Sequence, residues 1–168
     1  MLYIFGGLPG TGKSTLSSAL AKMLKAAYLR VDIVEQAMRD AGMGIDGPEG
    51  YMVCYALASQ QLRLGLDVIA DTVNPILATR QAWRGVAESL EMPFVEIEVI
   101  CSDNDEHRHR IETREVDIPR LVLPTWEQVV NRHYDAWDRD RIVIDTANRT
   151  VAECLQTLIE LSGRERNR

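Results

Sequence analysis

The feature that most constrains this chain is an octapeptide close to its first residue. Residues 7–14 are Gly-Leu-Pro-Gly-Thr-Gly-Lys-Ser, which matches the pattern G-x-x-x-x-G-K-[ST], and the apolar run 2–5 stands directly before them. In this pattern the glycines let successive backbone N–H groups point at a polyphosphate, and the N-terminal end of the following helix adds positive potential. The octapeptide therefore predicts a strand, a phosphate-binding loop and a helix in immediate succession.

The residues after the octapeptide supply the expected helix. Leu16, Leu20, Met23 and Leu24 recur at helical spacing. A chance match, in which a glycine-rich turn merely caps a helix, would not need both a strand before and a helix after. We therefore predict that the loop binds a nucleoside triphosphate, that Lys13 reaches the β- and γ-phosphates, and that the Ser14 hydroxyl ligates Mg²⁺. The residues predicted to contact the nucleotide are Gly7, Leu8, Pro9, Gly10, Thr11, Gly12, Lys13, Ser14 and Thr15.

Length and composition favour a single cytoplasmic domain that spans 1–168. The chain has 168 residues and a formal net charge of −6, which gives no general attraction for nucleic acid. We expect no N-terminal signal, because the first strand starts at once, and no membrane span, because the apolar runs fall short of ~20 residues. The three cysteines, Cys54, Cys101 and Cys154, suit buried positions in a reducing compartment.

Short apolar runs alternate with longer helical patterns, which predicts an α/β fold with a parallel sheet. The expected strands are 2–5, 28–31, 67–70, 94–100 and 141–144. The expected helices are 13–25, 32–41, 49–65, 76–91, 103–116, 124–138 and 149–162. Glycines are dense between 42 and 50, which indicates a loop, and the residues after Ser162 look like a frayed tail.

Two aspartates follow predicted strands, at the sheet edge where ligands of parallel sheets bind. Asp71 comes directly after 67–70, and Asp32 comes directly after 28–31. Asp71 suits a carboxylate that holds Mg²⁺, although it could instead cap the next helix. Asp32 is either a helix cap or the base that accepts the proton of a substrate hydroxyl. Arg39, about two helical turns further on, could contact an anionic acceptor or simply lie on the surface.

Residues 103–116 form the most charged stretch of the chain. Glu106, Arg110 and Arg114 are four apart, so a helix there would place them on one face. Two guanidiniums on one face suit the oxygens of a transferring phosphate, whereas ion pairs within a solvated helix are the alternative. In the predicted helix 124–138, Trp126, Tyr134 and Trp137 fit one buried stripe, although they could line an acceptor pocket.

The whole pattern resembles the small P-loop kinases, a group that includes polynucleotide kinases, gluconate kinase, chloramphenicol phosphotransferase and zeta-toxin-like kinases. The matching pieces are the loop at 7–15, Asp32, the segment 71–74, Arg110 with Arg114, and the segment 142–146. The resemblance implies the three-layer P-loop nucleoside triphosphate hydrolase fold with sheet order 2-3-1-4-5 and a short helical lid over about 103–123. It also implies ATP as the nucleotide, Asp32 as the acceptor base, and Arg110 and Arg114 as the phosphate clamp.

One departure concerns the acceptor. Many members of the group carry an arginine close behind the strand-two aspartate, whereas the first arginine after Asp32 in this chain is Arg39. The sequence thus predicts an ATP-dependent kinase that transfers the γ-phosphate to a hydroxyl of a small molecule, with Mg²⁺ as the metal. Two alternatives are a kinase of 5′-hydroxyl polynucleotide ends and an ATP-binding switch that phosphorylates nothing.

Overall fold

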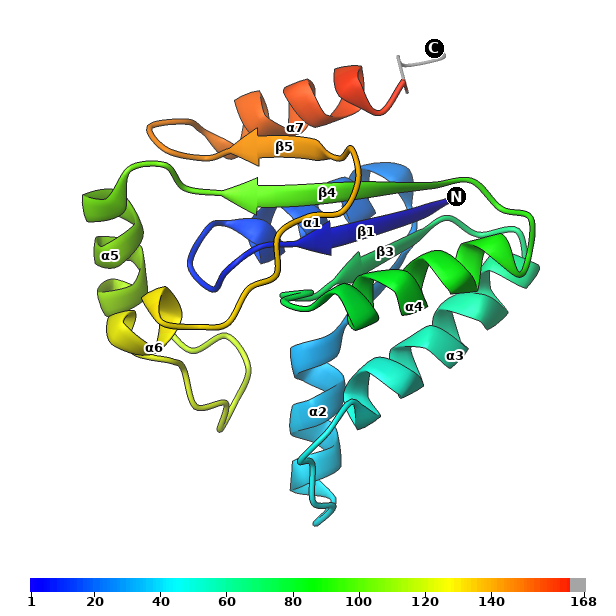
Figure 1. Cartoon of the computed structure of the whole chain (residues 1–168), viewed down its shortest axis with the longest axis horizontal. Helices are drawn as coiled ribbons and strands as arrows, with labels where there is room; N and C mark the ends of the chain where they lie inside the picture. The colour runs from blue at the N-terminus through cyan, green and yellow to red at the C-terminus, as the bar shows by residue number, and fades with distance from the viewer. Residues whose placement is uncertain (164–168) are drawn as a thin grey trace.

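Five strands form one parallel sheet in the computed structural model, which describes residues 1–163 (Figure 1). The sheet order is β2-β3-β1-β4-β5, so the predicted order 2-3-1-4-5 is confirmed. The strands are β1 (Leu2–Gly6), β2 (Ala27–Arg30), β3 (Val68–Asp71), β4 (Phe94–Ile100) and β5 (Ile142–Asp145). Each lies within a few residues of its predicted position.

Helices cover both faces of the sheet, which makes the three layers expected of the fold. The helices are α1 (Lys13–Leu24), α2 (Val31–Asp40), α3 (Glu49–Arg63), α4 (Leu77–Glu88), α5 (Asn104–Thr113), α6 (Trp126–Val130) and α7 (Val151–Leu161). Helices α1 and α7 pack together on one face, and α3 and α4 pack together on the other. Helices α5 and α6 lie beyond the tips of the strand arrows (Figure 1), so they stand where a ligand would bind.

The central strand β1 explains why the sheet needs both layers. Its five residues are all buried, and alternate side chains point to opposite faces. Tyr3 and Phe5 join the core formed with α1 and α7, whereas Leu2 and Ile4 join the core formed with α3 and α4. The strand thus ends, with its position fixed from both sides, at the start of the phosphate loop.

Several helices are shorter than predicted, and two of these differences concern the part of the chain near the ligand-binding edge of the sheet. The lid helix ends at Thr113 rather than 116, because Arg114 has extended backbone angles of φ −64° and ψ 141°. Helix α6 ends at Val130, so the predicted helix 124–138 is wrong over most of its length. The prediction of one buried stripe through Trp126, Tyr134 and Trp137 fails with it.

Segment 131–141 is not helical because its backbone binds other parts of the chain. The Asp135 N–H donates to the Pro75 carbonyl (2.8 Å), and the Asp135 carboxylate accepts from the Leu77 N–H at the start of α4 (2.7 Å). Arg80 donates to the carbonyls of Asp135 and Ala136 at 2.9 and 3.1 Å. These bonds fix the segment against α4 as an extended strap.

The tail predicted to fray lies mostly outside the described residues, since 164–168 are not described. In the described part, 1–163, no helix has both the length and the apolar character needed to span a membrane.

Candidate active site

The phosphate loop folds back on itself between β1 and α1. The Gly7 N–H donates to the Val73 carbonyl (3.1 Å), and the Thr11 hydroxyl donates to the Leu8 carbonyl (2.9 Å). Gly7 has φ 135°, and a Cβ there would come within 2.2 Å of the Val99 oxygen. At Gly10, with φ 82°, a Cβ would come within 2.5 Å of Ile111 of α5. Only glycine fits these two positions, because the chain turns tightly and α5 packs directly on the loop.

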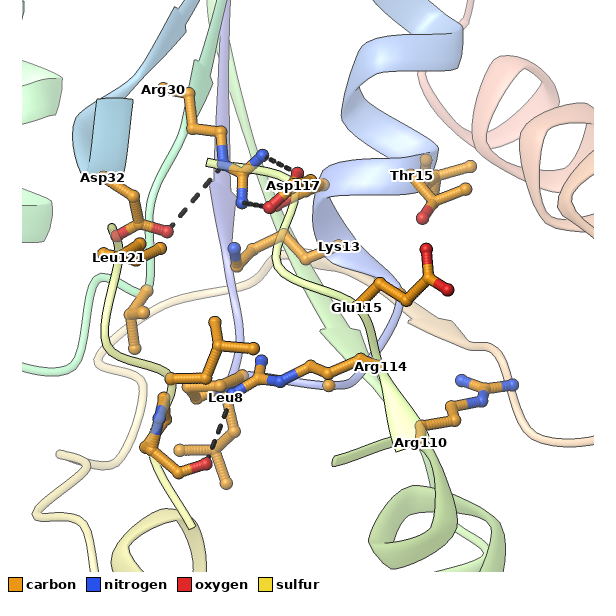
Figure 2. Close-up of a pocket in the computed structure, with 18 of the residues that line it drawn as sticks. Leu8, Lys13, Thr15, Arg30, Asp32, Arg110, Arg114, Glu115, Asp117 and Leu121 are labelled. Carbon is orange, nitrogen blue, oxygen red and sulfur yellow. Dashed lines mark hydrogen bonds and ion pairs between the residues drawn. The ribbon is translucent and has the colours of Figure 1, made fainter. Parts of the chain in front are cut away.

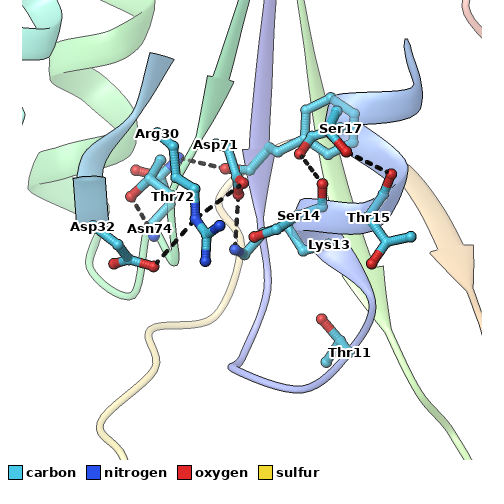
Figure 3. Close-up of polar contacts among 12 residues, drawn as sticks. Thr11, Lys13, Ser14, Thr15, Ser17, Arg30, Asp32, Asp71, Thr72 and Asn74 are labelled. Carbon is cyan, nitrogen blue, oxygen red and sulfur yellow. Dashed lines mark hydrogen bonds and ion pairs between the residues drawn. The ribbon is translucent and has the colours of Figure 1, made fainter. Parts of the chain in front are cut away.

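Lys13 and Asp71 form a buried ion pair at the end of the loop (Figure 3). The Lys13 ammonium lies 2.9 Å from one Asp71 oxygen, and the Tyr28 hydroxyl donates to the other at 2.6 Å. Burial alone would raise the pKa of Asp71, but the Lys13 ammonium and the hydrogen bonds hold it below its usual value. Burial and the Asp71 carboxylate raise the pKa of Tyr28, so this hydroxyl stays protonated and keeps donating.

A cleft of about 920 Å³ opens in front of this pair. Seven of the nine predicted nucleotide-contacting residues line it, and Gly7 and Thr11 do not. Asp32, Arg110 and Arg114 also line the cleft, so the predicted catalytic residues share one cavity (Figure 2). The cleft is large enough for a small molecule beside the nucleotide's phosphates.

Asp32 lies in the first turn of α2, where the helix N-terminus favours a negative charge. The N-cap of α2 is Arg30 rather than Asp32, which argues against the cap alternative. The Asp32 side chain is 41% exposed, and one of its oxygens lies 3.8 Å from the Arg30 Nε. An exposed carboxylate at the cleft wall can orient a hydroxyl.

The two predicted lid arginines point to different sides of the cleft. Arg110 donates to the Thr146 hydroxyl (2.8 Å) and carbonyl (3.0 Å), and it also pairs with Glu106. Arg114 follows the helix end, donates to the Pro124 carbonyl at 3.3 Å, and turns toward Leu8, away from Arg110 (Figure 2). The prediction that one helical face carries both is therefore wrong, although both reach the cleft.

The loop after β5 ties the phosphate loop to α5. The Thr146 hydroxyl donates to the Thr11 carbonyl at 2.8 Å and accepts from Arg110. The His107 ring lies 2.8 Å from the Pro9 carbonyl through Nε2 and packs edge-on against Trp126. Thr146 enters the sequence interpretation only as part of the matched segment 142–146, and His107 has no predicted role. No local spacing connects either residue to the phosphate loop.

Arg30 is the main cleft residue that the sequence analysis missed. It closes β2, two residues before Asp32, and its guanidinium binds the lid carboxylate of Asp117. Arg39, in contrast, pairs with Glu35 one turn back at 3.3 Å while its side chain lines the cleft. The sequence feature that could have identified Arg30 is a cationic side chain at the end of a strand, two residues before an aspartate.

The residues present fit a magnesium ion delivered with the nucleotide. The Ser14 hydroxyl is close enough to Asp71 to help lower the pKa of its carboxyl group, so two hard oxygen donors stand near each other at the end of the phosphate loop. Within 1–163 no group of three or more histidine, cysteine, aspartate or glutamate side chains forms a metal site. Magnesium needs no such cage, because phosphates and waters supply most of its ligands.

Proteins of known sequence and structure resemble this chain over most of its length. An adenylyl-sulfate kinase of a Synechococcus species is 27% identical over 165 residues, which cover 93% of this chain and 90% of the relative. The Mycobacterium tuberculosis APS kinase solved with AMPPNP and APS superposes with a TM-score of 0.71 at 18% identity, covering 96% of both chains. A gluconokinase from Sinorhizobium meliloti superposes with a TM-score of 0.66 at 14% identity, covering 96% of this chain and 91% of that one. The two superpositions establish the fold alone.

A family model described as an AAA domain matches residues 2–134, from the first strand through the lid and α6. The sequence predicts an ATP-dependent phosphotransferase that acts on an alcohol group, and the kinase relatives confirm that class. The resemblance to small P-loop kinases holds at this level, although adenylyl-sulfate kinases were not among the groups that it named. The chain thus belongs to the AAA domain family whose model it matches, within the P-loop kinases.

Proposed function

We propose that the protein transfers the γ-phosphate of ATP to a hydroxyl of a small molecule bound between the phosphate loop and α2. The observation that carries this proposal is that the phosphate-loop residue Lys13 and the carboxylate of Asp32 line the same cleft. Phosphoryl transfer needs alignment of the nucleophile with the γ-phosphate and compensation of charge, and little else from the protein. A phosphate-donor site and a carboxylate that can bind the acceptor hydroxyl, both in one cavity, can provide this alignment.

The roles of the residues follow from their places. Lys13 and the loop amides hold the phosphates, and Asp32 orients the acceptor hydroxyl and accepts its proton. Arg110 lies on the Thr146 side and contacts the nucleotide, whereas Arg114 lies on the Arg30 side and meets the transferring phosphoryl group. Ser14 and Asp71 would hold Mg²⁺, which neutralises charge on the phosphate oxygens when it is bound.

Adenylyl sulfate is the first acceptor to test, because the relatives that resemble nearly the whole chain are adenylyl-sulfate kinases. The screen offers ATP labelled in the γ-phosphate with adenylyl sulfate, gluconate, other hydroxylated metabolites and a 5′-hydroxyl oligonucleotide. Labelled small-molecule product supports the proposal. Label on the oligonucleotide alone would favour a polynucleotide kinase, and ATP binding with no labelled product from any acceptor would favour a switch.

The first prediction concerns Asp32 in the accepting step. Asp32→Asn keeps the shape of the side chain and removes the base, so kcat for transfer should fall by about 10²-fold or more while ATP still binds. The matched control is Asp46→Asn, an acidic residue in the loop between α2 and α3 that does not line the cleft. The assignment fails if Asp32→Asn transfers phosphate at the rate of the unmodified protein.

A further inference from the structure

An ion pair crosses the cleft between β2 and the lid. Both terminal nitrogens of Arg30 donate to the two carboxylate oxygens of Asp117, one of them at 3.2 Å, although the residues lie 87 positions apart (Figure 2). This two-point contact is the arrangement that a guanidinium makes with carboxylate, phosphate or sulfate alike. The position of the Asp117 carboxylate is therefore a position that another oxyanion could take.

The two partners differ in how firmly the structure holds them. The Arg30 side chain is 13% exposed, whereas the Asp117 side chain is 59% exposed. The buried Nε of Arg30 has no hydrogen-bond partner, and the nearest carboxylate oxygens, of Asp32 and Asp71, lie 3.8 and 3.9 Å away. Asp117 is thus the replaceable member of the pair, since it can leave for water at little cost and Arg30 cannot.

A second guanidinium turns toward the same part of the cleft. The buried Nε of Arg114 also has no hydrogen-bond partner. Burial lowers the pKa of Arg114, the carboxylates of Asp32 and Asp117 oppose this shift, and the positive charge of Arg30 adds to it. Two partly buried guanidiniums, each with a buried Nε that makes no hydrogen bond, therefore stand at one part of the cleft, where each can accept a further anionic partner.

We infer that the Asp117 carboxylate occupies the place on Arg30 that an anionic group of the acceptor takes when the acceptor binds. This inference rests on the proposed function and narrows its substrate class. The acceptor would carry a phosphate, sulfate or carboxylate group close to the hydroxyl that Asp32 orients, because Arg30 and Asp32 are neighbours. Asp117 and the acceptor would compete for Arg30, so binding of the acceptor would release the lid from β2.

Inorganic phosphate is the probe that tests the competition without any catalysis. It is titrated against the protein in the presence of saturating AMPPNP, so that the phosphate loop is already filled. Asp117→Asn should bind phosphate about fivefold more tightly than the unmodified protein, because the exposed competitor has lost its charge. Adding Arg30→Lys to Asp117→Asn should remove this gain, since an ammonium cannot form the two-point contact.

Glu112→Gln is the matched control. It removes a lid carboxylate whose partner is Arg108 on the exposed side of α5, and it should leave phosphate affinity unchanged. Asp117→Ser repeats the charge removal with a smaller side chain, which guards against a variant that fails to fold. The inference is overturned if neither Asp117 variant gains affinity, if the gain survives Arg30→Lys, or if Glu112→Gln gains as much.

Failure here is distinct from failure of the proposed function. A protein that binds AMPPNP and phosphorylates a small molecule, but shows no gain in the Asp117 variants, remains a kinase without this competition. A protein that shows the gain but yields no product keeps the anion subsite and loses the kinase assignment. If AMPPNP does not bind, the proposed function fails. The same variants are then compared without AMPPNP, because any inorganic phosphate bound at the phosphate loop contributes equally to the binding measured for each variant.

Discussion

Lys13 and Asp71 illustrate how the fold stabilises a lysine that we propose binds phosphates. A lysine that is to meet phosphates must lie in a site from which most water is excluded, where an unpaired ammonium is costly. The Asp71 carboxylate offsets this cost at 2.9 Å, and the Tyr28 hydroxyl offsets part of the burial of Asp71. The pair is thus a structural support and a candidate metal site at once.

Asp71→Asn should therefore lower the free energy of unfolding as well as activity. Loss of the charge leaves the Lys13 ammonium buried without a counterion, which should cost about 3 kcal/mol. Urea unfolding monitored by circular dichroism measures the effect. Glu112→Gln breaks an exposed ion pair of α5 and should cost less than about 1 kcal/mol. Equal losses in the two variants would show that the pair contributes no more than a surface contact.

Some residues in and beside the cleft could be predicted from the sequence, and others could not. Lys13 and Ser14 follow from the octapeptide, and Asp32 and Asp71 follow from their places at strand ends. Arg30 stands at a strand end as well, but its importance depends on Asp117, a residue far along the chain in the lid. No local spacing encodes a contact of this kind, because tertiary packing creates it.

Arg80 of α4 holds the strap formed by segment 131–141. Its side chain is fully buried and donates to the carbonyls of Asn74, Asp135 and Ala136. The guanidinium also lies over the rings of Tyr134 and Trp137, with its carbon 4.9 and 4.1 Å from their centroids. Asn74, which the family resemblance implicated, is buried here too and donates its side-chain amide to the Phe5 carbonyl.

Arg80→Met should destabilise the fold by about 3 kcal/mol, because three carbonyls lose a donor in a site that water does not reach. Arg108→Met, on the exposed face of α5, is the control and should cost about 0.5 kcal/mol or less. Denaturant midpoints of both variants give the comparison. A loss no greater in Arg80→Met than in the control would mean that the strap stays docked without Arg80.

The strap also shows why helices near the cleft were predicted too long. The order of the elements and of the strands could be predicted, because each strand is an apolar run and each crossover helix has a helical repeat. Segment 131–141 has aromatic residues at spacings that suit a helix, and its contacts with Arg80 and Leu77 override that pattern. The end of α5 at Thr113 is a similar case, since the next residues cross the cleft to reach Arg30.

The charge of the cleft lining is opposite in sign to the net charge of the chain. The chain carries a formal charge of −6, yet the cleft is lined by eight cationic side chains and four acidic ones. The cationic residues are Lys13, Arg30, Arg39, Arg110, Arg114, Arg120, Arg132 and Arg149. Such a cavity concentrates small anions, whereas the acidic remainder of the surface repels a long polyanion. This contrast favours a small anionic acceptor over a polynucleotide.

Salt should therefore slow the entry of the nucleotide. Raising NaCl from 0.05 to 0.5 M shortens the Debye length to a few ångströms, so the field of the cleft no longer reaches incoming anions. The association rate of a fluorescent ATP analogue, measured by stopped flow, should fall by about tenfold, with little change in its dissociation rate. Arg120→Gln with Arg132→Gln, which neutralises two cationic residues of the cleft lining away from the phosphate loop, should weaken this salt dependence. If the unmodified protein associates equally fast at both salt concentrations, the field of the cleft has no part in ligand capture, and the preference for anions must come from contacts made after entry.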